Sequence, residues 1–172
     1  MSNTSPMGMQ ALERMGGRME KPQFVYVTYI MTTPEKLWNA LVDGEMTKQY
    51  WGRARNVSDW KAGSPWRHED YDDAGMVKVV GTVVESIPPK RLVLTWAAPS
   101  NTADQTKHSR VTFEMEPMFG AVRLTVVHDE LEPGSETLRG ITQGWPAILS
   151  SLKTLLETGQ PMPGTTRRWG GS

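Results

Sequence analysis

Residues 108–130, HSRVTFEMEPMFGAVRLTVVHDE, contain two extended segments separated by a short turn. Apolar residues occupy alternate positions in both segments: Val111, Phe113, Met115, Val122, Leu124 and Val126. Such alternation is typical of strands with one face covered and the other in water. The link Met118-Phe119-Gly120 is too short for a parallel crossover. The stretch therefore predicts an antiparallel hairpin with one buried face.

Further strands are predicted on the N-terminal side of this hairpin. β-branched and aromatic residues fill short runs separated by turn residues, at positions 24–31, 53–59, 64–71, 76–87 and 91–97. From residue 53 onward the connections are short, and short connections join antiparallel neighbours. Together with the hairpin, these runs predict one antiparallel sheet of seven strands.

Helical signals follow the first strand. Either threonine before Pro34 can cap a helix that begins at this proline. Asp43-Gly44 ends that helix, and residues 45–50 form a second short one. We therefore expect two short helices between the first and second strands.

Residues 136–158 predict a long amphipathic helix. Apolar side chains recur three and four positions apart: Leu138, Ile141, Trp145, Leu149, Leu152 and Leu156. Gly140, Gly144 and Pro146 fall in its first half, where they weaken or bend a helix. The expected fold is α+β, with the seven-stranded sheet curling round this C-terminal helix. A cavity is expected where the helix and the sheet separate.

The chain divides into one folded domain at residues 23–159 and two flexible tails. Residues 1–22 hold five of the 11 Met but no aromatic or β-branched aliphatic residue, so they offer little packing surface. Residues 160–172 contain two prolines and several glycines without any periodicity. We expect neither tail to contribute to the core.

Composition excludes several classes of protein. The chain has 19 basic and 19 acidic residues and zero formal net charge, so attraction to nucleic acid or an anionic membrane is not expected. Having no Cys, it has no disulfide, thiolate metal site or cysteine nucleophile. No run approaches the roughly 18 apolar residues of a membrane helix, and no phosphate or dinucleotide loop is present. These features predict a cytoplasmic protein without a cofactor.

Tryptophan and histidine provide the candidate site. Seven Trp is a high count, and indole rings suit the walls of a pocket for flat or aliphatic ligands. The three His lie on separate predicted strands without ligand spacing, so no metal site is expected. His68 shares a strand face with Asp70, and His128 shares one with Glu130. The predicted pocket residues are Trp51, Trp66, His68, Trp96, Phe113, His128, Trp145, Leu149 and Leu152.

Several phrases of the chain resemble one known family. They are TTPEKLWNALVD (32–43), MTKQYWG (46–52), ESIPPKRLVLTW (85–96), VTFEMEP (111–117) and GWPAILSSLKTLLETG (144–159). Together they are similar to the homologues of the activator of heat-shock-protein-90 ATPase, within the START and birch-pollen-allergen-like (SRPBCC) superfamily. The resemblance implies a helix-grip fold, whose apolar pocket holds lipids, hormones or polyketides in other members.

Three functions remain open from the sequence. The first is a binding module for a small apolar or amphipathic ligand, with His68 or His128 orienting one polar group. The second is a cyclase, aromatase or hydrolase-like enzyme, which needs an ionisable pocket residue with a displaced pKa.

The third function is a stress-related or regulatory protein-interaction module, as the resemblance implies. It needs an exposed apolar patch on the outer face of the sheet, where the hairpin instead places charged and hydroxyl side chains. The residues favour the binding module over the enzyme. We expect the protein to be a monomer or a weak homodimer.

Overall fold

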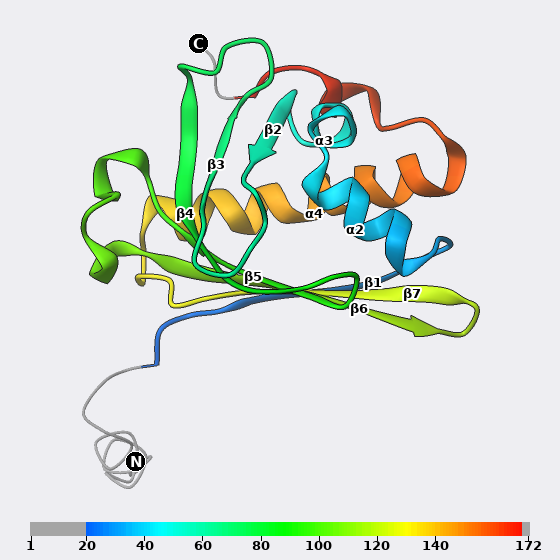
Figure 1. Ribbon diagram of the computed structural model, residues 1–172, viewed down its shortest axis with the longest axis horizontal. Coiled ribbons are helices and arrows are strands. Elements are labelled where there is room, and N and C mark those ends of the chain that lie inside the picture. The colour runs from blue at the N-terminus through cyan, green and yellow to red at the C-terminus, as the bar shows by residue number, and fades with distance from the viewer. Residues whose placement is uncertain (1–19, 170–172) are drawn as a thin grey trace, which may run out of the picture.

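The computed structural model describes residues 20–169, which form one seven-stranded antiparallel sheet, three α-helices and short 3-10 turns. The strand order is β1-β7-β6-β5-β4-β3-β2. The strands are β1 (Phe24–Ile30), β2 (Ala54–Val57), β3 (Pro65–Asp70), β4 (Val77–Ile87), β5 (Arg91–Trp96), β6 (Ser109–Met118) and β7 (Ala121–Asp129). Figure 1 shows this sheet curving around the long helix α4. The predicted α+β helix-grip architecture is confirmed.

The β6–β7 hairpin has the predicted facing. Val111 lies opposite His128, and Phe113 lies opposite Val126. All four side chains are buried, while the residues between them are more exposed. The covered face of the hairpin therefore forms the floor beneath α4.

Two short helices, α2 (Pro34–Val42) and α3 (Gly44–Tyr50), follow β1. The Thr33 hydroxyl accepts a hydrogen bond from the Lys36 amide, and Asp43 accepts one from the Glu45 amide. These caps satisfy amides that have no partner within their own helix. The two helices close one end of the curved sheet (Figure 1).

Helix α4 (Glu136–Thr158) lies on the concave face of the sheet. Ser135 caps its first turn, and Gly159 ends it in the left-handed conformation with φ 80°. Pro146 is inside the helix, which continues past it. Its buried side chains match the predicted stripe for the most part: Ile141, Trp145, Ile148, Leu149, Leu152 and Leu155. No helix among residues 20–169 combines the length and apolar character that a membrane crossing requires.

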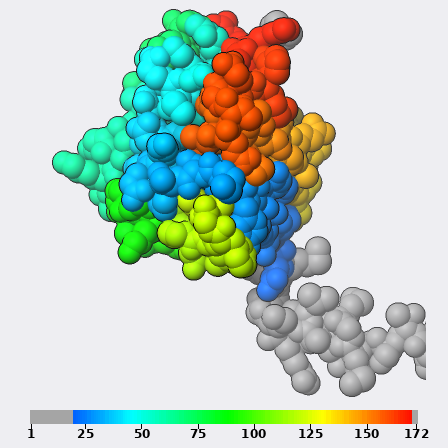
Figure 2. Space-filling view, turned by 90° about the vertical axis from the view of Figure 1, so that its right-hand side faces the viewer, coloured from blue at the N-terminus to red at the C-terminus, as the bar shows by residue number. Residues whose placement is uncertain are grey.

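The segment after α4 turns back onto the domain. Composition predicts a flexible extension from residue 160, but Thr165 and Trp169 of this segment contact the folded domain. Thr165, in the 3-10 turn Pro163–Thr166, is buried and hydrogen-bonds Ser151 of α4 and the Gln49 carbonyl of α3. Figure 2 shows this end of the chain, orange to red, beside the cyan of α3. Most of the predicted N-terminal tail, residues 1–19, lies outside the described residues.

Candidate functional site

A cavity of about 390 Å³ lies between the first half of α4 and strands β4 and β5. It opens to the surface and is lined mainly by apolar atoms. Its principal side chains are Trp51, His68, Lys78, Trp96, Trp145 and Trp169. This is the region between helix and sheet in which the sequence predicts a cavity.

Trp145 is the centre of the aromatic wall. Its ring centroid lies 5.3 Å from that of Trp51 and 5.7 Å from that of Trp96. Phe113 supports the indole from the sheet, edge to face, at 5.8 Å. Tilted and edge-to-face contacts of this kind are the favourable arrangements of aromatic rings. The wall is therefore rigid, because each indole is held by its neighbours.

Two glycines on α4 leave room for the cavity. Gly140 and Gly144 both line it. A Cβ atom built at Gly140 would meet nothing within 4 Å, and one at Gly144 would touch only the end of Ile148, at 3.8 Å. Sterics against the protein itself therefore do not require glycine at either position. Because neither residue has a side chain, the helix leaves space for the cavity at these two positions.

The sheet opens next to the cavity, where Trp66 enters between β4 and β5. The indole Nε1–H donates to the Thr95 carbonyl at 2.7 Å, and the Thr95 hydroxyl accepts from the Thr82 amide at 2.8 Å. Side-chain bonds thus take the place of ladder bonds at this point. Gly81 makes this possible, since a Cβ there would lie 1.9 Å from the Thr95 carbonyl oxygen.

His128 is buried beneath the aromatic wall in a chain of hydrogen bonds. Its Nδ1 accepts from Trp145 Nε1 at 3.1 Å, so the ring proton is on Nε2. That proton is donated to Ser109 Oγ at 2.8 Å, and Ser109 in turn donates to the Trp96 carbonyl. Burial lowers the pKa of His128 from 6.5 to about 4. The imidazole is therefore neutral and its tautomer is fixed.

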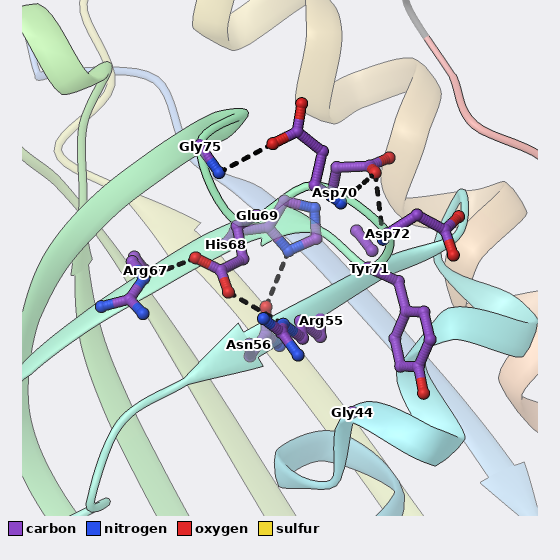
Figure 3. A network of polar contacts seen from close by, with 12 residues as sticks. Gly44, Arg55, Asn56, Arg67, His68, Glu69, Asp70, Tyr71, Asp72 and Gly75 are labelled. Atoms are coloured by element: carbon purple, nitrogen blue, oxygen red, sulfur yellow. Dashed lines mark hydrogen bonds and ion pairs between the residues drawn. The ribbon is translucent and has the colours of Figure 1, made fainter.

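His68 lies at the edge of the cavity and belongs to the polar network of Figure 3. Its Nδ1 donates to Asn56 Oδ1 at 2.7 Å, and the Asn56 amide donates to the Leu41 carbonyl. Burial, with a smaller effect of the Lys78 charge, lowers the pKa of His68 from 6.5 to about 3. Within residues 20–169 its Nε2 has no hydrogen-bond partner. The ring therefore offers one accepting nitrogen at the cavity.

The two buried carboxylates beside His68 are fully occupied by arginines. Glu69 accepts from Arg55 at 2.8 Å and from Arg67 at 2.5 Å (Figure 3). Asp70 binds Arg168 through both oxygens, at 2.7 and 2.8 Å. Burial raises the pKa of Glu69, but the two arginines outweigh it and the pKa is lowered. Both carboxylates hold the structure together and neither faces a substrate.

The C-terminal segment supplies one wall of the cavity. The Trp169 ring lies against Gly52, where a Cβ would come within 2.7 Å of it. Its indole Nε1–H donates to the Gly164 carbonyl, and its own carbonyl accepts from Lys78 at 3.3 Å. The Arg168–Asp70 ion pair fixes the preceding residue. A segment distant in sequence thus completes the pocket.

The structure separates the nine predicted pocket residues into three groups. Trp51, His68, Trp96 and Trp145 line the cavity together. Trp66 fills the opening in the sheet and lines a different hollow, together with Val80 and His108. Below the cavity, in the closed core, lie the remaining four: Phe113, His128, Leu149 and Leu152.

Sequence reasoning did not identify Lys78, Trp169, Gly140 or Gly144 as parts of the site. Lys78 is a lone cation in the valine-rich strand VKVVGTVV, which is a detectable signal. For Gly140 and Gly144, the sequence indicated only that they weaken or bend the helix. Trp169 had no local signal, because it follows a stretch without periodicity.

The site offers binding groups but no assembled catalytic machinery among residues 20–169. Ser109 and His128 are within hydrogen-bond distance, yet the Nε2 atom that would take the serine proton already carries one. His68 and Asp70 do not bond each other, and Glu130 is exposed at a turn with φ 56°. In this part of the chain no three His, Cys, Asp or Glu side chains are grouped to hold a metal.

Comparisons with known proteins agree with this architecture. The family model described as Activator of Hsp90 ATPase homolog 1-like protein matches residues 31–157. No curated protein matches the chain. The crystal structure of a Mesorhizobium loti protein is 25% identical, with a TM-score of 0.64, covering 78% of this chain and 96% of that one.

Two solution structures are similar as well. A Cytophaga hutchinsonii protein is 26% identical with a TM-score of 0.63, over 83% of this chain and 98% of that one. The Aha1 dimer from Colwellia psychrerythraea is 20% identical with a TM-score of 0.64, over 80% of this chain and 98% of that one. These matches share the fold of the domain over nearly their whole length.

Proposed function

Because the chain belongs to the family of Activator of Hsp90 ATPase homolog 1-like proteins, we propose that it binds a small, flat, largely apolar molecule in the cavity beside α4. One observation carries this proposal. Four tryptophans, Trp51, Trp96, Trp145 and Trp169, line one cavity of about 390 Å³. A volume of this size falls in the range of roughly 300 to 1,000 Å³ typical of ligand pockets.

The chemistry of the walls supports a planar ligand. Indole rings bind flat apolar groups through their faces, and the few polar groups of such a pocket fix the orientation of the ligand. Here those groups are the accepting Nε2 of His68 and the ammonium of Lys78. An amphipathic aromatic or polycyclic molecule fits this combination.

A binding role is favoured over catalysis by the state of the histidines. His68 and His128 both have a lowered pKa and are neutral at physiological pH. His128 uses both nitrogens in structural bonds, and His68 keeps one acceptor without a carboxylate on its other nitrogen. An activated nucleophile needs a base that is in turn oriented by a third group, which neither histidine provides.

Native mass spectrometry of freshly purified protein tests the proposal. We expect a reproducible small-molecule adduct that disappears on denaturation. Gly140→Leu should abolish the adduct, because its side chain would project beside the cavity from a position where a Cβ meets no protein atom within 4 Å. Thr142→Leu, on the exposed side of the same helix, is the matched control and should retain it.

The outcome that contradicts the proposal is equally clear. If the protein carries no adduct and binds no member of a panel of aromatic and polycyclic compounds, the cavity is not a ligand site. An adduct that survives Gly140→Leu unchanged would place the ligand elsewhere on the protein.

A second candidate function, self-association through β1, is favoured by a separate observation. The outer face of this edge strand carries a row of exposed apolar side chains: Val25, Val27, Tyr29 and Met31, with Phe119 of the neighbouring turn 88% exposed. The Tyr29 and Phe119 rings lie 5.9 Å apart, so the row is continuous with the turn. A contiguous apolar row of this kind indicates a protein contact.

We propose a second copy of the chain as the occupant of this row, and the dimeric state of the Colwellia psychrerythraea protein supports it. Sedimentation velocity over a concentration series tests it. A dimer that Val27→Glu dissociates, and that the control Gln143→Glu on the exposed side of α4 does not, is the expected result. A monomer at all concentrations would overturn it.

A further inference from the structure

Lys78 is the cation of the cavity. It lies on β4 between two valines and lines the cavity together with Trp96 and Trp169. Because these neighbours exclude water, burial lowers the pKa of the Lys78 ammonium. A partly desolvated charge is unfavourable unless it is paired.

The protein provides Lys78 with a weak partner only. Its ammonium donates to the main-chain carbonyl of Trp169 at 3.3 Å, and no carboxylate among residues 20–169 lies within 4.0 Å of it. Three other lysines of the described chain do have carboxylate partners: Lys21, Lys48 and Lys153. The other described lysines without an ion pair are exposed: Lys36, Lys61, Lys90 and Lys107. Lys78 therefore differs from all of them in being partly buried without a counter-charge.

The acid that acts on Lys78 is not available to pair with it. Asp70 influences its pKa, as does Arg168, with an opposite sign. Both Asp70 oxygens bind Arg168, and one of them also accepts from the amides of Asp72 and Asp73. This carboxylate is saturated, and Glu136, the other acid that lines the cavity, forms no ion pair with Lys78. An anionic ligand in the cavity would therefore meet an ammonium without a carboxylate partner.

The walls of the cavity also indicate which molecular frame would carry such an anionic group. Four indole rings line the same cavity as Lys78, and His68 is close enough for the Lys78 charge to lower its pKa further. An acidic group at Lys78 would thus extend from a flat aromatic frame. A hydroxyl next to it could donate to His68.

We infer that the ligand of this cavity is an aromatic acid, and that Lys78 selects it by pairing with its carboxylate or phenolate oxygen. The inference rests on the proposed function, because it names the chemical class of the molecule that the cavity binds. When the anion binds, the Lys78 ammonium donates to it in place of the Trp169 carbonyl. Lys78 is accordingly the specificity residue of the site.

A pair of matched probes tests this assignment by isothermal titration calorimetry. 2-Naphthoate carries the charge, and naphthalen-2-ylmethanol is its neutral counterpart on the same ring system. We expect the full-length protein to bind the acid at least about tenfold more tightly than the alcohol, as one charge-assisted hydrogen bond allows. The preference should weaken at high salt, since it is electrostatic.

Three variants assign the preference to one residue. Lys78→Met should bring the ratio of the two affinities close to one, mainly by weakening 2-naphthoate. Lys78→Arg keeps the charge and should keep the preference, so the assignment remains testable if the methionine variant folds poorly. Lys61→Met, at an exposed turn, is the matched control and should leave the ratio unchanged.

Each contrary outcome has a definite meaning. Equal affinity of the wild type for both probes leaves the proposed function standing and overturns the selection of an acid. A preference that persists in Lys78→Met shows that another group selects the charge. If neither probe binds, the inference of an aromatic acid fails, while the proposed pocket is decided separately by the adduct and the compound panel.

Discussion

The indole Nε1–H of Trp145 donates to His128 Nδ1 at 3.1 Å, joining the central wall of the cavity to the floor of the sheet. This bond crosses from α4 to β7 and sets the tautomer of a buried imidazole. The hydrogen bond also orients the indole, because the ring cannot rotate away from the cavity unless this bond breaks. The shape of the site therefore depends on a neutral His128.

Acid should destabilise the protein before its carboxylates titrate. Folding lowers the pKa of His128 from 6.5 to about 4 and that of His68 to about 3. The stabilisation from each neutral ring is complete above the unfolded pKa and is lost as the pH falls towards the folded pKa. Between about pH 7.5 and about pH 5, each ring should reduce the free energy of unfolding by about 2 kcal/mol.

Urea unfolding at the two pH values measures this effect. His128→Asn should lose about half of the pH-dependent difference, whatever its absolute stability. His108→Gln leaves both buried rings in place and is the control. A wild type whose stability is the same at both pH values would contradict the assignment of two buried neutral histidines.

Gly140→Ala should stabilise the protein. Gly140 lies inside α4, and a Cβ there meets nothing within 4 Å, so the change adds helix propensity without a clash. We expect a gain of up to about 1 kcal/mol in the free energy of unfolding, measured by denaturant titration. Combined with the loss of ligand binding expected for Gly140→Leu, a gain would indicate that glycine is kept for the cavity. A loss of stability would show that the helix needs glycine here for itself.

Gly81→Ala should be strongly destabilising. The new Cβ would lie 1.9 Å from the Thr95 carbonyl oxygen and 2.5 Å from the Trp66 indole nitrogen, and the first of these is a backbone atom that cannot easily move. We expect a loss of several kcal/mol or failure to fold. Trp66→Phe, which removes the Nε1 donor and part of the buried ring, should cost about 1 to 3 kcal/mol. Thermal unfolding of both variants against Gly140→Ala checks the ranking, and an unperturbed Gly81→Ala would refute it.

Arg168→Ala should release the C-terminal wall of the cavity. The Asp70 carboxylate is inaccessible to water, and without Arg168 it keeps only the two amide donors. Because the Arg168 side chain is 41% exposed, water screens the pair, and we expect a moderate loss of stability. Hydrogen exchange should rise along residues 163–169.

Arg167→Ala is the matched control, since the neighbouring side chain has no ion pair among residues 20–169. It should leave exchange and stability unchanged. Equal protection of residues 163–169 in both variants would show that Trp169 and Thr165 hold the segment without the ion pair.

Most of the architecture could be predicted from local sequence. The alternation in residues 108–130 specifies strand and buried face together, and the turn between them is too short for any but an antiparallel pairing. The stripe on α4 identifies the face that meets the sheet. These features follow from residues that are close in the chain, where period and turn length determine the geometry.

The site could be predicted only in part. The aromatic residues Trp51, Trp96 and Trp145 meet at the cavity as expected from their number and their positions on core-facing elements. Phe113 and Leu152 have the same character but lie in the closed core. Nothing in a local pattern distinguishes a residue that lines a void from one that fills it, because this depends on how far the helix stands from the sheet.

What the sequence by itself determined was the set of strands and helices and the side that each one buries. What only the tertiary structure decided was which residues surround the cavity. The Lys78–Trp169 contact joins positions 91 residues apart, and Asp70–Arg168 joins positions 98 apart. Such pairs form only after the sheet has curved and the chain has returned past α4, so no local period encodes them. Local patterns specify secondary structure because they act within one element, whereas a binding site requires several elements to converge.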